Sequence, residues 1–85
     1  MKNIYIGNLS SNLTPDEIRT LFATFGAVQR VEIMTDPGSG YSRGFAFVEM
    51  TEDGAASKAV VTLNGTTVWG KPLRVEEARP QFHPT

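Results

Sequence analysis

Aromatic residues on one face of an expected strand are the side chains best suited to bind a ligand. Side chains alternate between the two faces of an extended chain, so Phe45 and Phe47 point to one side of residues 43–50. An unpaired base that stacks on such a ring gains about 1 to 3 kcal/mol. Together with Tyr5 from another short strand, they predict a stacking surface for flat ligands such as unpaired bases.

Charged residues of both signs accompany these rings. Arg30, Arg43 and Arg74 are balanced by Glu32, Glu49 and Glu76. A guanidinium group can stack on bases and bind phosphate through two hydrogen bonds, and a balanced set predicts modest salt dependence with hydrogen bonds to base edges. The candidate polar contacts, which also include residues at a strand edge and in the tail, are Asn3, Arg30, Arg43, Glu49, Arg74, Glu76 and Arg79.

The first half of the chain predicts a strand, a helix and a second strand. Apolar and other residues alternate over residues 4–7 and again over residues 28–34. Between them, Thr14 and Glu17 form a capping box that starts a helix, and Gly26 supplies its stop. The residues expected on the core face of this helix are Ile18, Leu21, Phe22 and Phe25.

The second half repeats the pattern after a loop rich in turn-forming residues. The expected elements are a strand over residues 43–50, a helix over residues 51–65, and short strands over residues 66–69 and 73–75 separated by a turn at Gly70, Lys71 and Pro72. The order β-α-β-β-α-β predicts an α+β, ferredoxin-like sandwich with two helices on one face of a four-stranded antiparallel sheet. We expect one domain over residues 1–78 and a flexible tail over residues 79–85.

This fold decides which residues are exposed. If the helices cover Ala46, Val48 and Met50, then Phe45 and Phe47 lie on the open face beside the first strand. Exposed aromatic area on a small protein usually marks an interaction surface.

The composition narrows the class of function. A chain of 85 residues has room for one core. No Cys and a single His exclude disulfide, zinc and thiol chemistry, so we expect no metal and no cofactor. A net charge of -1 argues against holding duplex DNA through bulk charge. We find no stretch apolar enough for a membrane span or signal sequence and expect a cytoplasmic monomer.

Two motifs resemble those of a known family. Arg43-Gly44-Phe45-Ala46-Phe47-Val48-Glu49-Met50 resembles the RNP1 motif of the RNA-recognition motif (RRM) family at every position but the last, and Ile4-Tyr5-Ile6-Gly7-Asn8-Leu9 resembles its RNP2 motif. The resemblance extends over about residues 2–78 and is closest to the short single-RRM RNA-binding proteins of bacteria, including the cyanobacterial type. It implies base stacking on Tyr5, Phe45 and Phe47 and a phosphate contact from Arg43.

The chain departs from the family pattern at two positions. Met50 replaces an aromatic residue, but its parity places it in the core, so the departure affects packing and not stacking. Tyr41 stands where similar proteins often carry a basic residue, which leaves open whether a phosphate contact is lost or a ring gained.

Three functions can be compared with these features. The leading one is non-enzymatic binding of single-stranded RNA, with single-stranded DNA open as a competitor, in post-transcriptional regulation or RNA chaperoning. The alternative is a protein-binding RRM-like module, although such relatives tend to lose the sheet aromatics. The third, a small enzyme such as an acylphosphatase, lacks its phosphate-cradling loop here.

Simpler interpretations of single residues need no ligand. They are core packing for the two phenylalanines, a solvated charge for Arg43, and for Trp69 a hairpin residue packed beside the second helix.

Overall fold

The computed structural model describes residues 2–35, 38 and 42–78, with the backbone only at residues 35, 42 and 43. The elements in chain order are β1 (Lys2–Gly7), α1 (Pro15–Ala23), β2 (Val28–Thr35), β3 (Ser42–Met50), α2 (Asp53–Leu63), β4 (Thr67–Val68), β5 (Lys71–Pro72) and β6 (Arg74–Ala78). This is the expected β-α-β-β-α-β order with a small hairpin, β4–β5, added before the last strand.

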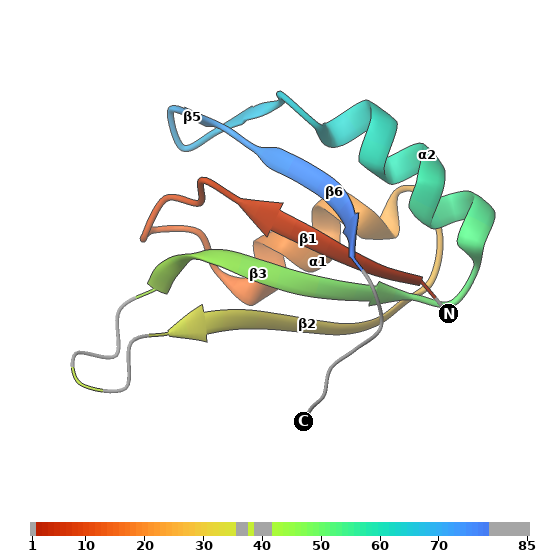
Figure 1. Ribbon diagram of the computed structural model, residues 1–85, viewed down its shortest axis with the longest axis horizontal. Helices are drawn as coiled ribbons and strands as arrows, with labels where there is room; N and C mark the ends of the chain where they lie inside the picture. Colours follow the sequence, from red (N-terminus) through yellow and green to blue (C-terminus); the bar gives the residue numbers. More distant parts are fainter. Residues whose placement is uncertain (1, 36–37, 39–41, 79–85) are drawn as a thin grey trace.

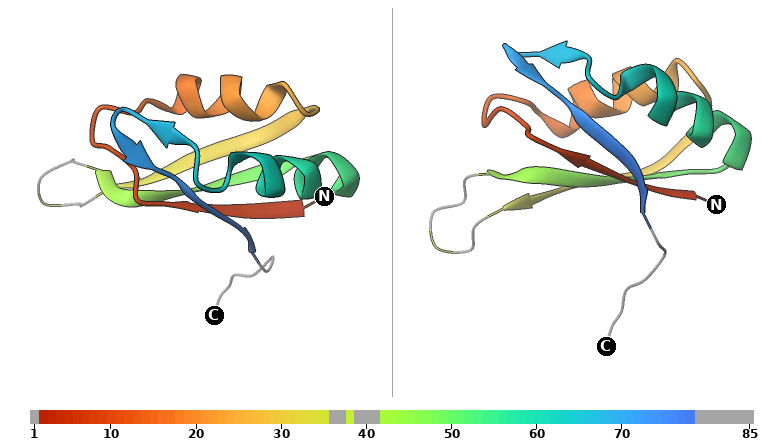
Figure 2. Two further views of the ribbon diagram at one scale, coloured as in Figure 1. Left: turned by 90° about the horizontal axis from the view of Figure 1, so that it is seen from above. Right: turned by 45° about the horizontal axis from the view of Figure 1, so that its top comes forward.

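Four strands form one antiparallel sheet in the order β2-β3-β1-β6, which is the predicted ferredoxin-like arrangement (Figure 1). Both helices lie on the same side of this sheet (Figure 2). The central strands β1 and β3 carry the two sequence motifs and pair directly, with Tyr5 opposite Phe47. The other side of the sheet, which neither helix of the described residues covers, is called the open face below.

The core lies between the sheet and the helices. Ile4 and Ile6 of β1 and Ala46, Val48 and Met50 of β3 are all buried, as the alternation predicts. Met50 is 0% exposed, so the departure from the RNP1 pattern does fall in the core.

Helix α1 begins as its sequence predicts. The Thr14 backbone N–H donates to Glu17 Oε1 over 3.0 Å, and the Glu17 N–H donates to Thr14 Oγ1 over 3.2 Å, which completes the capping box. Pro15 occupies the first turn, where its missing N–H costs no hydrogen bond. The helix ends at Ala23, before the predicted Phe25, and the Phe25 N–H donates instead to the Phe22 carbonyl in a final turn.

Helix α2 is shorter than predicted and starts at Asp53 instead of residue 51. The Thr51 N–H donates to the Ala27 carbonyl over 3.2 Å, and this bond holds Thr51 beside the start of β2. Ala56 and Ala59 are 0% exposed, and their small side chains let the helix approach the sheet closely.

The predicted turn of the hairpin was wrong by one or two residues. Trp69 and Gly70, and not Gly70 to Pro72, form the turn, because both have positive φ (54° and 78°) and Val68 pairs with Lys71. Two left-handed residues give a hairpin turn whose twist matches that of the strands. The last strand of the main sheet then runs to Ala78, beyond the expected Val75.

Candidate nucleic-acid interface

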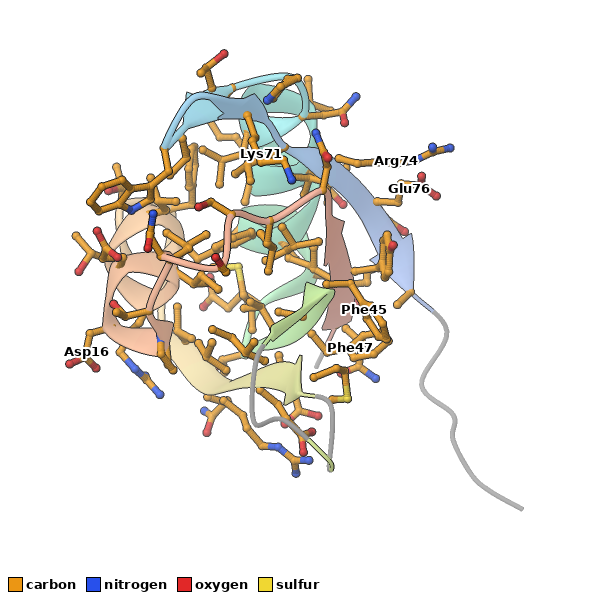
Figure 3. The ribbon with its side chains drawn as sticks, turned by 90° about the vertical axis from the view of Figure 1, so that its left-hand side faces the viewer. Asp16, Phe45, Phe47, Lys71, Arg74 and Glu76 are labelled. Atoms are coloured by element: carbon orange, nitrogen blue, oxygen red, sulfur yellow. The ribbon has the colours of Figure 1, made fainter. Side chains whose placement is uncertain are left out.

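The open face is a grid of side chains whose rows cross the four strands. The strand registers place three rows on it: Arg30, Glu49, Asn3 and Ala78; Glu32, Phe47, Tyr5 and Glu76; and Phe45, Gly7 and Arg74. Figure 3 shows Phe45, Phe47, Arg74 and Glu76 on the side of the sheet away from Asp16 of α1. The candidate residues of the described strands therefore do come together on one surface.

Tyr5, Phe45 and Phe47 form a compact cluster, the aromatic triad. The ring centroid of Tyr5 lies 6.0 Å from that of Phe45 and 5.9 Å from that of Phe47, and the two phenylalanine centroids are 6.1 Å apart. Tyr5 and Phe45 are tilted by 30°, whereas Phe47 meets both rings edge-on, at 63° and 87°. Phe47 is 36% exposed and neither other ring belongs to the buried core, so burial on both faces was the wrong interpretation.

Gly7 supports the triad and was missed by the sequence analysis. A Cβ atom placed on Gly7 would lie 2.6 Å from Tyr5 Oη and 3.0 Å from two ring carbons, so the Tyr5 ring lies over this glycine. Gly7 pairs with Phe45 across the strands, which brings the Tyr5 ring toward Phe45. The signal in the sequence is a glycine two positions after an aromatic residue within a strand, where glycine often marks a close approach.

The two described arginines of the face are each bound to a glutamate on the same strand. Arg30 Nη2 lies 3.2 Å from Glu32 Oε1, and Arg74 Nε lies 2.7 Å from Glu76 Oε2. The hydrogen bond from Arg74 to Glu76 raises the pKa of the Arg74 guanidinium above its usual value. Such exposed pairs contribute little to stability, so a phosphate can replace the glutamate at small cost.

The remaining polar candidates divide into two groups. Glu49 and Asn3 face each other across β3 and β1, and within the described part of the chain neither side chain makes a hydrogen bond or ion pair. Arg43 belongs to β3 by its backbone, but its side chain lies outside the described residues, as do Tyr41, Arg79 and the expected tail. Their roles and the domain boundary at residue 78 stay predictions.

Trp69 lies in the hairpin, as expected, but it contacts a different helix. Its indole N–H donates to both carboxylate oxygens of Glu17, over 3.2 and 3.4 Å, so it packs beside the first helix and not the second. It is 56% exposed and flanks a shallow groove lined by Leu13, Asp16, Glu17, Thr20, Leu21 and Val68. This groove lies on the helical side, so Trp69 does not join the aromatic triad.

The RNA recognition motif family model matches residues 4–74. The chain belongs to the RNA recognition motif family. It is 45% identical to "Putative RNA-binding protein RbpD" of Nostoc sp. (strain PCC 7120 / SAG 25.82 / UTEX 2576) over 92% of this chain and 83% of that protein. This confirms the family resemblance of the two motifs.

Solved structures agree with the fold. The crystal structure of RNA Binding Protein PG1 superposes with a TM-score of 0.90 at 37% identity, covering 95% of this chain and all of that one. A Sex-lethal protein/RNA complex gives a TM-score of 0.87 at 38% identity, covering 94% of this RRM chain and 48% of that one. The described residues include no helix that could cross a bilayer and no cluster of potential metal ligands.

Proposed function

We propose that this RRM protein binds single-stranded RNA by stacking unpaired bases on the aromatic triad, without catalysing a reaction. The observation that carries the proposal is the placement of three rings, each about 6 Å from the others, on the sheet face that the helices leave open. Bases of single-stranded RNA stack on aromatic side chains in this manner, and each contributes about 1 to 3 kcal/mol.

The charged residues would add the phosphate and edge contacts. Arg30 and Arg74 lie at opposite corners of the open face, and each can exchange its glutamate partner for a phosphate. Membership of a family with RNA-binding relatives supports RNA as the ligand. We further propose action as a cytoplasmic monomer in post-transcriptional regulation or RNA chaperoning, with single-stranded DNA as a competitor to be tested.

The decisive experiment measures fluorescence anisotropy of labelled short random single-stranded RNA with the parent protein and the Phe47→Ala variant. We expect Phe47→Ala to weaken binding by about 1 to 3 kcal/mol, because it removes one stacking surface. Its melting temperature should fall much less than that of a core truncation, because Phe47 is 36% exposed and lies outside the buried core. Unlabelled DNA of matching composition serves as the competitor.

Met50→Ala is the matched control from the other face of the same strand. Met50 is 0% exposed, so its truncation should cost about 2 to 5 kcal/mol of unfolding free energy. Its affinity per folded molecule should remain that of the parent. Equal RNA binding by the parent and a folded Phe47→Ala variant would contradict the proposal, and absence of binding by the parent would favour a protein-binding module.

A further inference from the structure

Glu49 is the one acid of the open face that has no arginine partner among the described residues. Glu32 and Glu76 are each ion-paired, whereas the half-buried Glu49 carboxylate makes no hydrogen bond or ion pair there. Arg30 lies directly across from Glu49 in the β2–β3 register, yet its guanidinium is bound to Glu32 instead. Within the described part of the chain, the Glu49 oxygens are therefore open acceptors.

Its position places these acceptors beside a stacking surface. Glu49 follows Phe47 by two residues on the same face, about 7 Å along the strand. Asn3 is its cross-strand partner and brings an amide group with no bonded partner in the described part of the chain. A base stacked on Phe47 can therefore extend its edge toward a carboxylate and an amide.

The chemistry of these groups distinguishes the bases. A carboxylate only accepts hydrogen bonds, and it repels phosphate, so its favourable partner in RNA is a base edge with donors. Guanine presents two adjacent donors, N1–H and the N2 amine, with the O6 acceptor next to them. Uracil offers only one ring donor. Adenine and cytosine carry a ring-nitrogen acceptor beside their amine, and this acceptor would face the carboxylate and be repelled by it.

We propose that Glu49 selects guanine at the Phe47 position, with its two oxygens accepting from N1–H and N2–H and the Asn3 amide donating to O6. This inference rests on the proposed stacking of RNA on the open face. It assigns Glu49 and Asn3 a role in specificity and makes guanine-containing single-stranded RNA the preferred class of ligand.

The test compares short single-stranded RNAs that differ at one position of an adenosine background. The parent should bind the guanosine form about 5- to 150-fold more tightly than the all-adenosine form, the range expected for a two-bond contact to one base. Inosine lacks the N2 amine but keeps N1–H and O6, so its affinity should fall between the two. Equal affinities for guanosine and inosine would overturn the two-oxygen contact.

Glu49→Gln is the isosteric variant, and Glu52→Gln is its matched control. Both remove one negative charge, so each can raise the affinity for all RNAs, and the readout is the ratio of guanosine to adenosine affinity. Glu49→Gln should lose most of this ratio, because the amide retains one acceptor and adds a donor that opposes N1–H or the amine. Glu52→Gln should keep it, because Glu52 lies between β3 and α2, outside the open face, and its removal leaves the pair of Arg30 with Glu32 intact.

The outcomes separate this inference from the function on which it rests. A guanosine preference that survives Glu49→Gln would overturn the role of Glu49. Equal binding of all bases, with Phe47→Ala still weakening them all, would overturn guanine selection and leave stacking intact. Absence of binding to every RNA would contradict the proposed function as well.

Discussion

Gly7 is a single residue on which the geometry of the aromatic triad depends. Its missing side chain leaves the space in which the Tyr5 ring lies along β1 and packs against Phe45. Glycine within a strand has an entropic cost in folding. Its presence at position 7 is explained by the Tyr5 ring, which fills the space that a side chain would need. The residue thus acts by positioning Tyr5 and needs no contact with RNA.

Gly7→Ala should weaken RNA binding while leaving the fold intact. The added Cβ would lie 2.6 Å from Tyr5 Oη, so the Tyr5 ring must move away from Phe45. The fold should persist, because alanine reduces the conformational entropy of the unfolded chain. We expect RNA binding to weaken by part of the stacking contribution of about 1 to 3 kcal/mol, as measured by anisotropy titrations. Nuclear Overhauser effects between the Tyr5 and Phe45 rings should also weaken.

Gly54→Ala is the control for the chemical change itself. A Cβ on Gly54 meets no atom within 4 Å, and this glycine lies in the first turn of α2 on the other side of the sheet. Gly54→Ala should leave the RNA affinity unchanged and should not reduce the free energy of unfolding. Unchanged ring contacts and affinity in Gly7→Ala would contradict the positioning role.

At the scale of elements, α1 and the β4–β5 hairpin are joined through Glu17. This carboxylate accepts from the Thr14 backbone in the capping box and from the Trp69 indole of the hairpin turn. The hydrogen bond from the Thr14 backbone, with those from the Thr14 and Trp69 side chains, holds the pKa of Glu17 below its usual value, against a smaller opposing effect of desolvation. The ionised form of Glu17 is therefore favoured by folding.

The stabilisation from Glu17 should disappear at low pH. Because the folded pKa is below the unfolded one, this stabilisation is complete above the ordinary value of 4.5 and is lost as pH falls through the lowered folded value. The difference in unfolding free energy between the parent and Glu17→Gln should shrink accordingly in denaturant titrations at neutral and acidic pH. Glu52→Gln is the control, because the Glu52 side chain makes no capping bond at the start of α2, and a similar pH-dependent difference there would contradict the assignment.

The charge of the whole molecule sets how strongly salt affects binding. The net charge is -1, and on the open face Arg30 and Arg74 are each neutralised by a glutamate. Each phosphate contact to a single strand contributes a slope of about -0.7 to the logarithmic dependence of affinity on salt. A protein built in this way should rely on stacking more than on counterion release.

We expect the salt slope for RNA binding to be shallower than about -2, equivalent to at most about three phosphate contacts. Anisotropy titrations over a series of KCl concentrations measure it. Glu76→Gln should steepen the slope, because it frees Arg74 for phosphate. A slope steeper than about -3 for the parent would show that charge and not stacking dominates binding.

The sequence by itself determined the features that arise within a few residues of the chain. Alternation assigned Met50 to the core and Phe47 to the open face, and the spacing of Thr14 and Glu17 located the start of α1. Both follow from local rules, since side chains in a strand alternate and a capping box spans three residues. The order β-α-β-β-α-β predicted the ferredoxin-like sandwich, and the two motifs predicted the family.

Only the tertiary structure decided which distant side chains meet and at what angle. Trp69 contacts Glu17, which is 52 positions away in sequence, and the Tyr5 ring lies over Gly7 at a tilt to Phe45 that no spacing predicts. Arg30 pairs with Glu32 on its own strand, so the Glu49 carboxylate beside Phe47 has no partner among the described residues. Strand register and side-chain rotamers decide these contacts, because residues far apart in the chain become neighbours only once the sheet has formed.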